Sequence, residues 1–393
     1  MRRERTTPLG LYLAVPFCRS KCSYCNFASQ VFAPAQYAEY CELLAREIGL
    51  AAAADGLAGA TLTSIYWGGG TPTLLPAEGF ARVAAAIGEH FTIAPDAEHT
   101  VEAAPGTLGP ERLALLAASG VNRLSLGVQS FADAELRAVG RLHRAATVRQ
   151  DLAQARAAGI ANLNLDLIAG LPHQTEASWR ATLEATLAEA VPHVSVYMLE
   201  VDEDSRLGKE LLAEGPRYHA GAVPDEAFIA DAYEFARAAL EAAGVRQYEI
   251  SNFARRGSAS RHNLGYWTRR PYLGVGLDAH SFLTGPRPRR FANPDTLADW
   301  LGPLRAGRLP RGEAAWLTPR AEREERYFLG LRRNAGVAMP GRDAEPAQAA
   351  AAARHLAGGL LERRGGRIAL TAQGRLLANR VLADFLEEPL ALS

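Results

Sequence analysis

Residues 16–27 read Pro-Phe-Cys-Arg-Ser-Lys-Cys-Ser-Tyr-Cys-Asn-Phe, a stretch that holds three of the four cysteines in this chain of 393 residues. The three lie at C-x3-C-x2-C spacing, and no fourth cysteine follows close behind. An iron–sulfur cube normally takes four thiolates, so three would leave one iron with an open coordination position where chemistry can take place. The stretch therefore predicts a [4Fe-4S] cluster bound by Cys18, Cys22 and Cys25.

Two other uses of the cysteines stay open. A structural zinc site usually has four ligands in paired C-x2-4-C or His-containing halves, and no second half lies near this stretch. Free cysteines also pack like small hydrophobic side chains. Cys41 belongs to a helical pattern over residues 37–48, so we expect it to be packed in the core and not to bind metal.

Charge and hydropathy exclude several classes of protein. The chain has 43 basic and 43 acidic residues, which gives no electrostatic argument for a nucleic-acid partner. No apolar run approaches the roughly 18 residues of a membrane span. A cleaved signal peptide would remove or abut the cysteines, so none is expected. Clustered thiols favour metal over disulfides in a reducing compartment, and we therefore expect a cytoplasmic protein.

Short apolar runs alternate with helical patterns along the first half of the chain, which predicts six βα units and a parallel sheet. The expected strands cover residues 11–15, 63–67, 99–103, 122–128, 162–168 and 193–198. Ligands of such sheets gather outside the carboxyl ends of the strands. The cysteines and the Gly68–Thr73 loop follow the first two strands, and the polar residues Glu102, Gln129 and Asp166 lie at or near the ends of the next three.

Three motifs together resemble one family. C-x3-C-x2-C with Tyr24 before the last cysteine is similar to the signature of the radical S-adenosylmethionine superfamily. The Trp-Gly-Gly-Gly-Thr-Pro-Thr run at 67–73 and His-Asn-Leu-Gly-Tyr-Trp at 262–267 resemble the HemW haem chaperone family within it. The resemblance implies an α/β fold: a partial (β/α)6 TIM-like barrel over residues 1–225, a region 226–315 that completes the core, and a small, mostly helical C-terminal domain over 316–393.

The resemblance also implies where S-adenosylmethionine would bind. On its own residues the glycine loop is better interpreted as a tight turn, and it lacks the ending and the spacing of a phosphate-binding loop. The cysteines before it make a ligand-binding loop plausible. Each polar residue at a strand end is, taken singly, an ordinary surface group. Many relatives have a histidine where Ala14 stands, so its contribution is absent here. The positions that match the family's cofactor pocket are Tyr12, Tyr24, Gly69, Gly70, Thr71, Glu102, Gln129, Arg141 and Asp166.

His262 is the candidate haem ligand, because neutral imidazole is a common axial donor to haem iron. A histidine in an aromatic segment is more often packed and hydrogen-bonded than bound to iron. The similarity of His262-Asn-Leu-Gly-Tyr-Trp to the family's H-N-x-x-Y-W motif favours haem.

Two functions fit the resemblance. One is a chaperone that holds haem, a cluster and S-adenosylmethionine and delivers haem to respiratory membrane haemoproteins, with peripheral membrane contact and a homodimer left open. The other is an oxygen-independent coproporphyrinogen III dehydrogenase. Those relatives read C-x3-C-x2-C-x-C and have a longer N-terminal segment, whereas here Phe27 takes the fourth position and 17 residues precede Cys18. We therefore expect haem binding without porphyrinogen decarboxylation, and leave open whether S-adenosylmethionine is cleaved.

Overall fold

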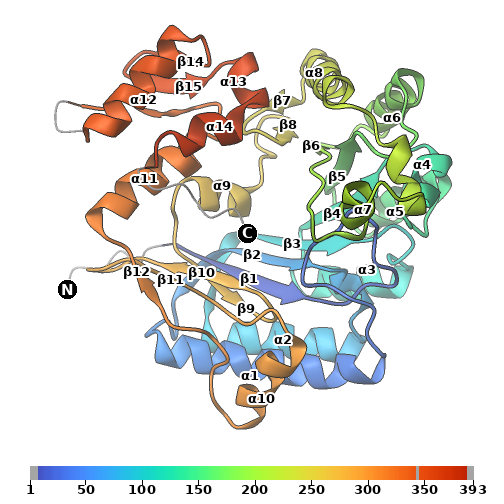
Figure 1. The fold of residues 1–393 in the computed structure, drawn as a ribbon. Helices are drawn as coiled ribbons and strands as arrows, with labels where there is room; N and C mark the ends of the chain where they lie inside the picture. Colours follow the sequence, from blue (N-terminus) through green and yellow to red (C-terminus); the bar gives the residue numbers. More distant parts are fainter. Residues whose placement is uncertain (1–7, 342–344, 387–393) are drawn as a thin grey trace.

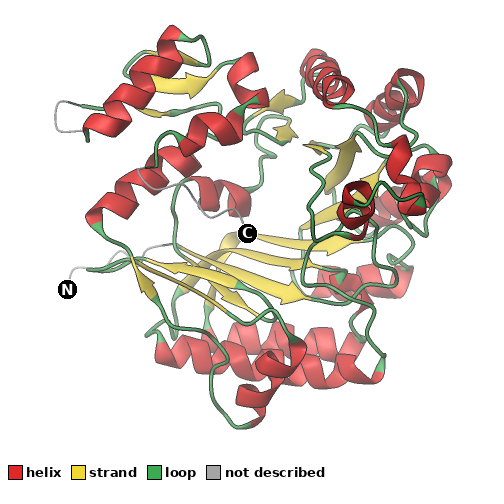
Figure 2. Cartoon of the chain, in the orientation of Figure 1, coloured by secondary structure: helices red, strands yellow, loops and turns green. Residues whose placement is uncertain are grey.

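A single large sheet organises the chain (Figures 1 and 2). The structure is a computed structural model that describes residues 8–341 and 345–386. Residues 1–7, on which the expectation about a signal peptide partly rests, lie outside the described residues, as does the end of the expected C-terminal domain. The sheet has twelve strands in the order β12-β11-β10-β9-β1-β2-β3-β4-β5-β6-β8-β7.

The six predicted strands form the parallel centre of this sheet. Each pairs with the next in parallel, which confirms the predicted α/β fold with a partial barrel. They are β1 (Leu9–Val15), β2 (Thr61–Gly69), β3 (Thr92–Ala103), β4 (Arg123–Gln129), β5 (Asn162–Ala169) and β6 (His193–Met198). Because all six run the same way, their carboxyl ends and the loops that follow them meet at one rim.

Six further strands extend the sheet at both edges. On one side β9 (Tyr272–Val275) pairs in parallel with β1, and β10 (His280–Leu283), β11 (Arg289–Ala292) and β12 (Ala315–Trp316) follow in antiparallel order. On the other side β8 (Asn252–Ala254) pairs antiparallel with β6 and with β7 (Arg246–Gln247). The sheet therefore ends in two edges and does not close.

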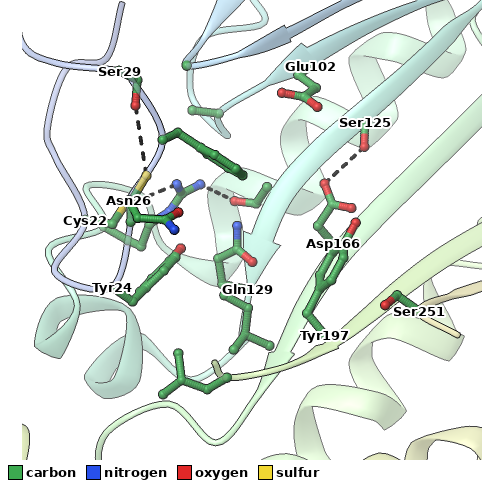
Figure 3. A pocket seen from close by; sticks show the side chains of 18 of the residues that line it. Cys22, Tyr24, Asn26, Ser29, Glu102, Ser125, Gln129, Asp166, Tyr197 and Ser251 are labelled. Atoms are coloured by element: carbon green, nitrogen blue, oxygen red, sulfur yellow. Dashed lines mark hydrogen bonds between the residues drawn. The ribbon is translucent and has the colours of Figure 1, made fainter. Parts of the chain in front are cut away.

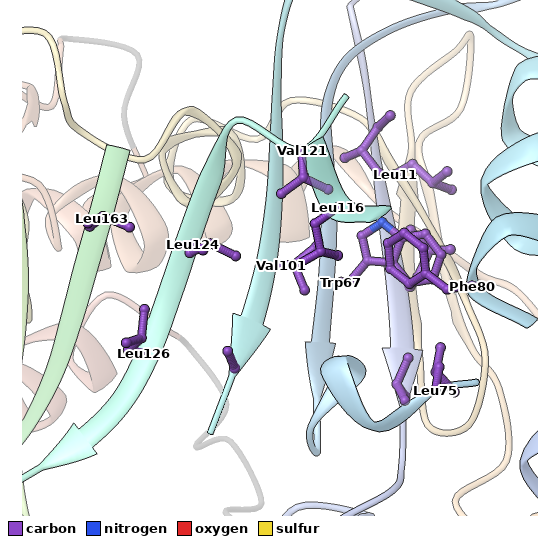
Figure 4. Close-up of a cluster of buried hydrophobic side chains, with 14 of the residues drawn as sticks. Leu11, Trp67, Leu75, Phe80, Val101, Leu116, Val121, Leu124, Leu126 and Leu163 are labelled. Atoms are coloured by element: carbon purple, nitrogen blue, oxygen red, sulfur yellow. The ribbon is translucent and has the colours of Figure 1, made fainter. Parts of the chain in front are cut away.

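The helices that follow the parallel strands cover the outer face of the sheet (Figure 2). They are α1 (Ala35–Ala54), α2 (Ala77–His90), α3 (Pro110–Ala118), α4 (Asp133–Ala138), α5 (Ala145–Ala157), α6 (Glu176–Ala188) and α8 (Glu226–Ala242). Figure 4 shows the packing between sheet and helices, where Trp67 of β2 stacks on Phe80 of α2 with ring centroids 4.3 Å apart. Shorter helices are η1 (Pro72–Leu74), α7 (Arg206–Leu212), η2 (Arg217–Ala222), α9 (Arg261–Trp267) and α10 (Leu297–Arg305).

Residues 319–386, called here the C-terminal unit, have a hydrophobic cluster of their own, which includes Tyr327, Ile368, Val381 and Phe385. The unit contains more strand than expected, because β13 (Val337–Ala338), β14 (Leu361–Arg364) and β15 (Arg367–Leu370) form a three-stranded antiparallel sheet. Its helices are α11 (Pro319–Gly330), α12 (Pro346–Ala357), α13 (Ala372–Leu376) and α14 (Ala378–Ala383). The three-part division of the chain stays a prediction.

Backbone hydrogen bonds attach the C-terminal unit to the edge of the large sheet. The Ile250 N–H donates to the Arg332 carbonyl and the Asn334 N–H to the Tyr248 carbonyl, both at 3.0 Å. These bonds lie next to β7 and β8, at the edge beyond β6.

Among the helices that the structure describes, none is both long and apolar enough to cross a bilayer.

Candidate functional site

The cysteine loop leaves β1 at Val15 and is held by its own hydrogen bonds. The Cys18 N–H donates to the Gln30 carbonyl at 3.0 Å, and the Lys21 ammonium donates to the carbonyls of Phe27 and Ser29 at 2.5 and 2.7 Å. These contacts fold the loop so that Cys18, Cys22 and Cys25 all line one cavity of about 1040 Å³. Cys41, a residue of α1, is buried in the core as expected and does not line the cavity.

Polar donors surround the three sulfur atoms. The Arg141 Nη1 donates to the Cys22 Sγ at 3.7 Å, the Thr71 hydroxyl donates to the Cys18 Sγ at 4.0 Å, and the Ser29 hydroxyl lies 4.0 Å from the Cys25 Sγ. The Arg141 Nε is buried without a partner among the described residues. Soft thiolates with a guanidinium and hydroxyls beside them suit the net negative charge of a thiolate-bound cluster. The three cysteines therefore fit a [4Fe-4S] cluster.

The described residues contain no group of three or more His, Cys, Asp or Glu side chains arranged to hold a single metal ion. A site for a single metal ion differs in geometry from a site for an iron–sulfur cube. A lone zinc ion requires every sulfur within about 2.3 Å of one point, whereas each thiolate of a cube binds a different iron.

The glycine loop after β2 packs directly on the cysteine loop. The Gly70 N–H donates to the Val15 carbonyl and the Thr71 N–H to the Phe17 carbonyl, both at 2.7 Å. A Cβ at position 70 would lie 2.6 Å from the Phe17 carbonyl oxygen, which is too close for a side chain, so only glycine fits there. Gly69 has a φ of 101°, in the left-handed region that favours glycine. These glycines are thus required by the contact between the two loops, and Gly69, Gly70 and Thr71 line the cavity.

Glu102, at the carboxyl end of β3, lies on the cavity floor beside the glycine loop (Figure 3). Its carboxylate accepts hydrogen bonds from the Tyr66 hydroxyl at 2.7 Å and from the Gly69 N–H at 3.2 Å. Burial raises the pKa of Glu102 to about 7, even with these two bonds, and the charge of Asp166 also raises it. A buried carboxyl near its midpoint at neutral pH is suited to bind a cationic group, which would favour its ionised form.

Asp166 and Gln129 complete the floor, and Figure 3 shows both side chains directed into the same space as Glu102. The Asp166 carboxylate accepts hydrogen bonds from Ser125 at 3.0 Å and Asn164 at 2.8 Å, and burial raises its pKa. Gln129 has a φ of 68°, where β4 and β5 shift register. Uncommon backbone conformations of this kind cluster at binding sites, where the surrounding structure supports them.

The two predicted tyrosines differ in position. Tyr24 lines the cavity next to the cysteines. Tyr12 does not line it. Its ring stacks on that of Tyr66, with centroids 6.0 Å apart, inside the curve of the sheet. Tyr66, which lines the cavity and bonds Glu102, was not predicted, although its place in β2 just before the glycine loop was a usable signal.

His262 lies apart from this cavity, in α9 at the amino-end side of the sheet. Its Nδ1 is 2.9 Å from the Ser64 hydroxyl and its Nε2 is 2.7 Å from the Tyr266 hydroxyl. Tyr66 separates the imidazole from the cavity: its ring stacks on that of His262 with centroids 5.1 Å apart, and Tyr66 itself lines the cavity. The imidazole is 3% exposed, and burial lowers its pKa to about 3. Both ring nitrogens are hydrogen-bonded, so binding of haem iron would require one of these two bonds to be released. The ligation by His262 stays a prediction.

Comparisons with known proteins concern the family and the fold of the chain. A model of the radical SAM superfamily matches residues 12–186. The chain is 36% identical over 382 residues to heme chaperone HemW of Mycobacterium tuberculosis H37Rv, covering 96% of this chain and 95% of that protein. The corresponding figures for HemW of Bacillus subtilis are 34% identity over 384 residues, with 96% and 99% covered. This chain belongs to the HemW family.

The fold comparison extends beyond HemW proteins. A solved structure of coproporphyrinogen III oxidase (HemN) from Escherichia coli, described as a radical SAM enzyme, matches with a TM-score of 0.83 and 25% identity. The match covers 98% of this chain and 91% of that one. This chain therefore has the same overall fold as HemN, including the C-terminal unit.

The C-terminal unit contributes residues to the cavity that the sequence did not indicate. Arg332, Arg375, Leu377 and Arg380 all line it, together with the three cysteines. They lie at least 300 residues after the cysteine loop and in short or irregular segments, so no local pattern connects them with a site. Only the packing of the C-terminal unit against the sheet edge brings them there.

Proposed function

We propose that this protein is a cytoplasmic haem chaperone, which binds haem together with a [4Fe-4S] cluster and S-adenosylmethionine and delivers haem to respiratory membrane haemoproteins. The observation that carries the proposal is the sequence similarity to proteins named heme chaperone HemW, which reaches 36% identity over 96% of this chain. Delivery would involve peripheral contact with the membrane. The proposal includes assembly as a homodimer.

The cavity supports the binding of both small cofactors. Cys18, Cys22 and Cys25 would hold the cluster, and an iron without a protein thiolate could take the amino-acid end of S-adenosylmethionine. Glu102, Gln129 and Asp166 would contact the cofactor from the floor, with Gly69, Gly70 and Thr71 on one side and Arg141 and Tyr24 on the other. When bound, the cluster and cofactor would supply one-electron chemistry. The chain's own residues orient the cofactor and limit the access of water.

The second candidate is a coproporphyrinogen III dehydrogenase, which the likeness to HemN favours. Phe27 argues against it. The dehydrogenase signature has a fourth cysteine at that position, whereas here an apolar side chain that is 65% exposed lines the cavity. The two candidates therefore differ in what the protein should do with a porphyrinogen.

One preparation tests both functions. The protein is purified and its cluster reconstituted without oxygen, then titrated with haem in the presence and absence of S-adenosylmethionine while the haem absorption spectrum is followed. We expect saturable haem binding at one molecule per chain. Incubation with coproporphyrinogen III, an electron donor and S-adenosylmethionine should give no protoporphyrinogen IX. Conversion of the porphyrinogen would establish the enzyme, and absence of haem binding would reject the chaperone.

A further inference from the structure

The part of the cavity wall that comes from the C-terminal unit contains three arginines, Arg332, Arg375 and Arg380, that form no salt bridge with a described carboxylate. Arg375 is only 9% exposed, and its Nε is buried without a hydrogen-bond acceptor among the described residues. Its Nη1 donates to the Leu370 carbonyl at 3.2 Å. The Glu234 carboxylate attracts the Arg375 guanidinium electrostatically, but its salt bridge, at 2.7 Å, is with Arg237.

Two further arginines stand on the same wall. The Arg332 Nε is also buried without a hydrogen-bond acceptor, and the guanidinium packs over the rings of Trp267 and Phe328 at 5.4 and 5.0 Å. The Glu249 and Glu200 carboxylates interact with its charge but form no salt bridge with it. Arg380 is exposed and forms no ion pair with any described residue. Burying a cation without an acceptor is unfavourable, so a group of this kind points to an anion that completes it.

The rim of the same cavity is apolar. Phe27, Leu142 and Leu377 line it with exposures of 65%, 71% and 40%, although large apolar side chains are usually buried. They come from the cysteine loop, the segment before α5 and the C-terminal unit, so the apolar contact surface is assembled from three parts of the chain. Exposed apolar groups that converge on a cavity with a few charged groups are typical of a binding site for an amphipathic molecule.

From these two features we propose that the large cavity holds a haem-binding subsite, in which Arg375 and Arg380 pair with the two propionate carboxylates and Phe27, Leu142 and Leu377 contact the apolar face of the macrocycle. The inference rests on the proposed haem-binding function and gives it a location. Planar guanidinium groups suit carboxylates because two N–H groups can donate in parallel. The volume of about 1040 Å³ slightly exceeds the roughly 300–1,000 Å³ typical of small-molecule sites, and in the proposed function the cluster and S-adenosylmethionine share this space with haem.

A carboxylate is also present in S-adenosylmethionine, so the experiment must separate the two sources. Haem and haem dimethyl ester, whose propionates are uncharged, are each titrated into the reconstituted protein with and without S-adenosylmethionine. The proteins are the unaltered chain, Arg380→Gln, Arg375→Gln and Arg375→Lys. The control is Arg363→Gln, since Arg363 is an exposed arginine in β14 of the same unit that does not line the cavity.

We expect the unaltered chain to bind haem on the order of 10-fold more tightly than the dimethyl ester, because hydrogen bonds to charged groups contribute more than neutral ones. Arg380→Gln and Arg375→Gln should reduce this ratio through weaker haem binding and leave ester binding unchanged. Arg375→Lys should retain part of the ratio, and Arg363→Gln all of it. Thermal unfolding checks that Arg375→Gln is folded, and Arg380→Gln, at an exposed position, tests the subsite if it is not.

The outcomes separate the subsite from the function. Equal affinity for haem and its ester in the unaltered chain, or a ratio that survives in both arginine variants, would overturn the subsite while haem binding stands. Loss of the ratio in Arg363→Gln as well would also overturn it, because the effect would then be one of general charge. If S-adenosylmethionine affinity falls instead of haem affinity, the arginines bind the cofactor. Binding of neither tetrapyrrole would reject the proposed function, and the subsite with it.

Discussion

The N–H of Thr71 donates a hydrogen bond to the carbonyl oxygen of Phe17 at 2.7 Å, which joins the glycine loop to the cysteine loop one residue before Cys18. The parallel pairing of β1 and β2 brings the two loops to the same rim, with Val15 beside Gly69. Thr71 also donates through its hydroxyl to the Cys18 Sγ. The position of the first cysteine therefore depends on the backbone of the glycine loop.

Gly70→Ala should disturb this contact. The added Cβ would lie 2.6 Å from the Phe17 carbonyl oxygen and 2.8 Å from that of Val15, and neither backbone atom can move away independently. We expect the free energy of unfolding to fall by about 1–3 kcal/mol, the usual effect of overpacking. Iron content after anaerobic reconstitution should fall as well, as measured by iron and sulfide analysis.

Gly88→Ala is the matched control. Gly88 lies in α2, and a Cβ there would meet no atom within 4 Å. Alanine is favoured over glycine in a helix by roughly 0.5–1 kcal/mol, so this variant should be slightly more stable and bind iron normally. A Gly70→Ala protein with unchanged stability and iron content would show that the loop contact is not needed.

The second prediction concerns the cysteines themselves. Replacing Cys18, Cys22 or Cys25 by Ser should in each case abolish most iron–sulfur absorption, because a hydroxyl is a poor donor to soft iron–sulfur centres. Cys41→Ala should retain it, since Cys41 is packed in the core away from the cavity. If zinc is found in place of iron after oxygen-free purification and reconstitution, the cluster prediction is wrong.

The third prediction is a pH dependence that comes from Glu102. Its pKa is raised from 4.5 to about 7 by burial, so between these pH values the folded state binds more protons than the unfolded state. Stability linked to this group therefore falls as pH rises from about 4.5 to 7 and then levels off, by roughly 3 kcal/mol in total. Glu102→Gln removes this dependence. The unfolding temperature of the variant should therefore rise relative to that of the unaltered chain as pH increases from about 4.5 to 7.

Glu111→Gln serves as the control for this measurement, because Glu111 is an exposed carboxylate in α3. Its unfolding temperature should follow that of the unaltered chain at every pH. A constant difference between Glu102→Gln and the unaltered chain from pH 4.5 to 8 would mean that Glu102 titrates normally. The comparison uses cluster-free protein, so that cofactor binding does not contribute.

Much of the fold could be predicted from sequence because the parallel strands are long apolar runs with helices between them. The helical pattern over residues 37–48 lies within α1, Ala35–Ala54, and the strand expected at 193–198 is β6, His193–Met198. The strands that extend the sheet were harder, since β7 and β12 have two residues each and β10 has four. Runs that short carry no readable periodicity, and their pairing is decided by tertiary contacts.

Some residues of the candidate site could likewise be predicted from sequence, and others could not. Cys18 and Glu102 could be predicted because each lies where a parallel strand ends, and parallel strands end at a common rim. Arg375 could not, because it reaches the cavity only through the attachment of the C-terminal unit beyond β7 and β8. For His262 the motif indicated a ligand, whereas no sequence pattern indicated that Ser64 and Tyr266 would form hydrogen bonds with both ring nitrogens.

The last prediction concerns the two roles that His262 can have. As a haem ligand, its Nε2 must release the Tyr266 hydroxyl, so Tyr266→Phe would remove a competitor and strengthen haem binding. As part of the interior of the sheet, His262 instead stacks on Tyr66, with ring centroids 5.1 Å apart, and Tyr66 in turn bonds Glu102 on the cavity floor. It would then affect the cavity only through Tyr66.

From the described contacts we expect Tyr266→Phe to lower the free energy of unfolding by about 1 kcal/mol, one hydrogen bond, and to leave haem affinity unchanged. His262→Ala should lower it by about 2–4 kcal/mol, because it creates a cavity and leaves Ser64 and Tyr266 without their partner. The haem spectrum of each folded variant provides the second readout, since loss of an axial imidazole changes it. A stronger haem complex in Tyr266→Phe, with an altered spectrum in His262→Ala, would establish His262 as the ligand and require that α9 opens to admit haem.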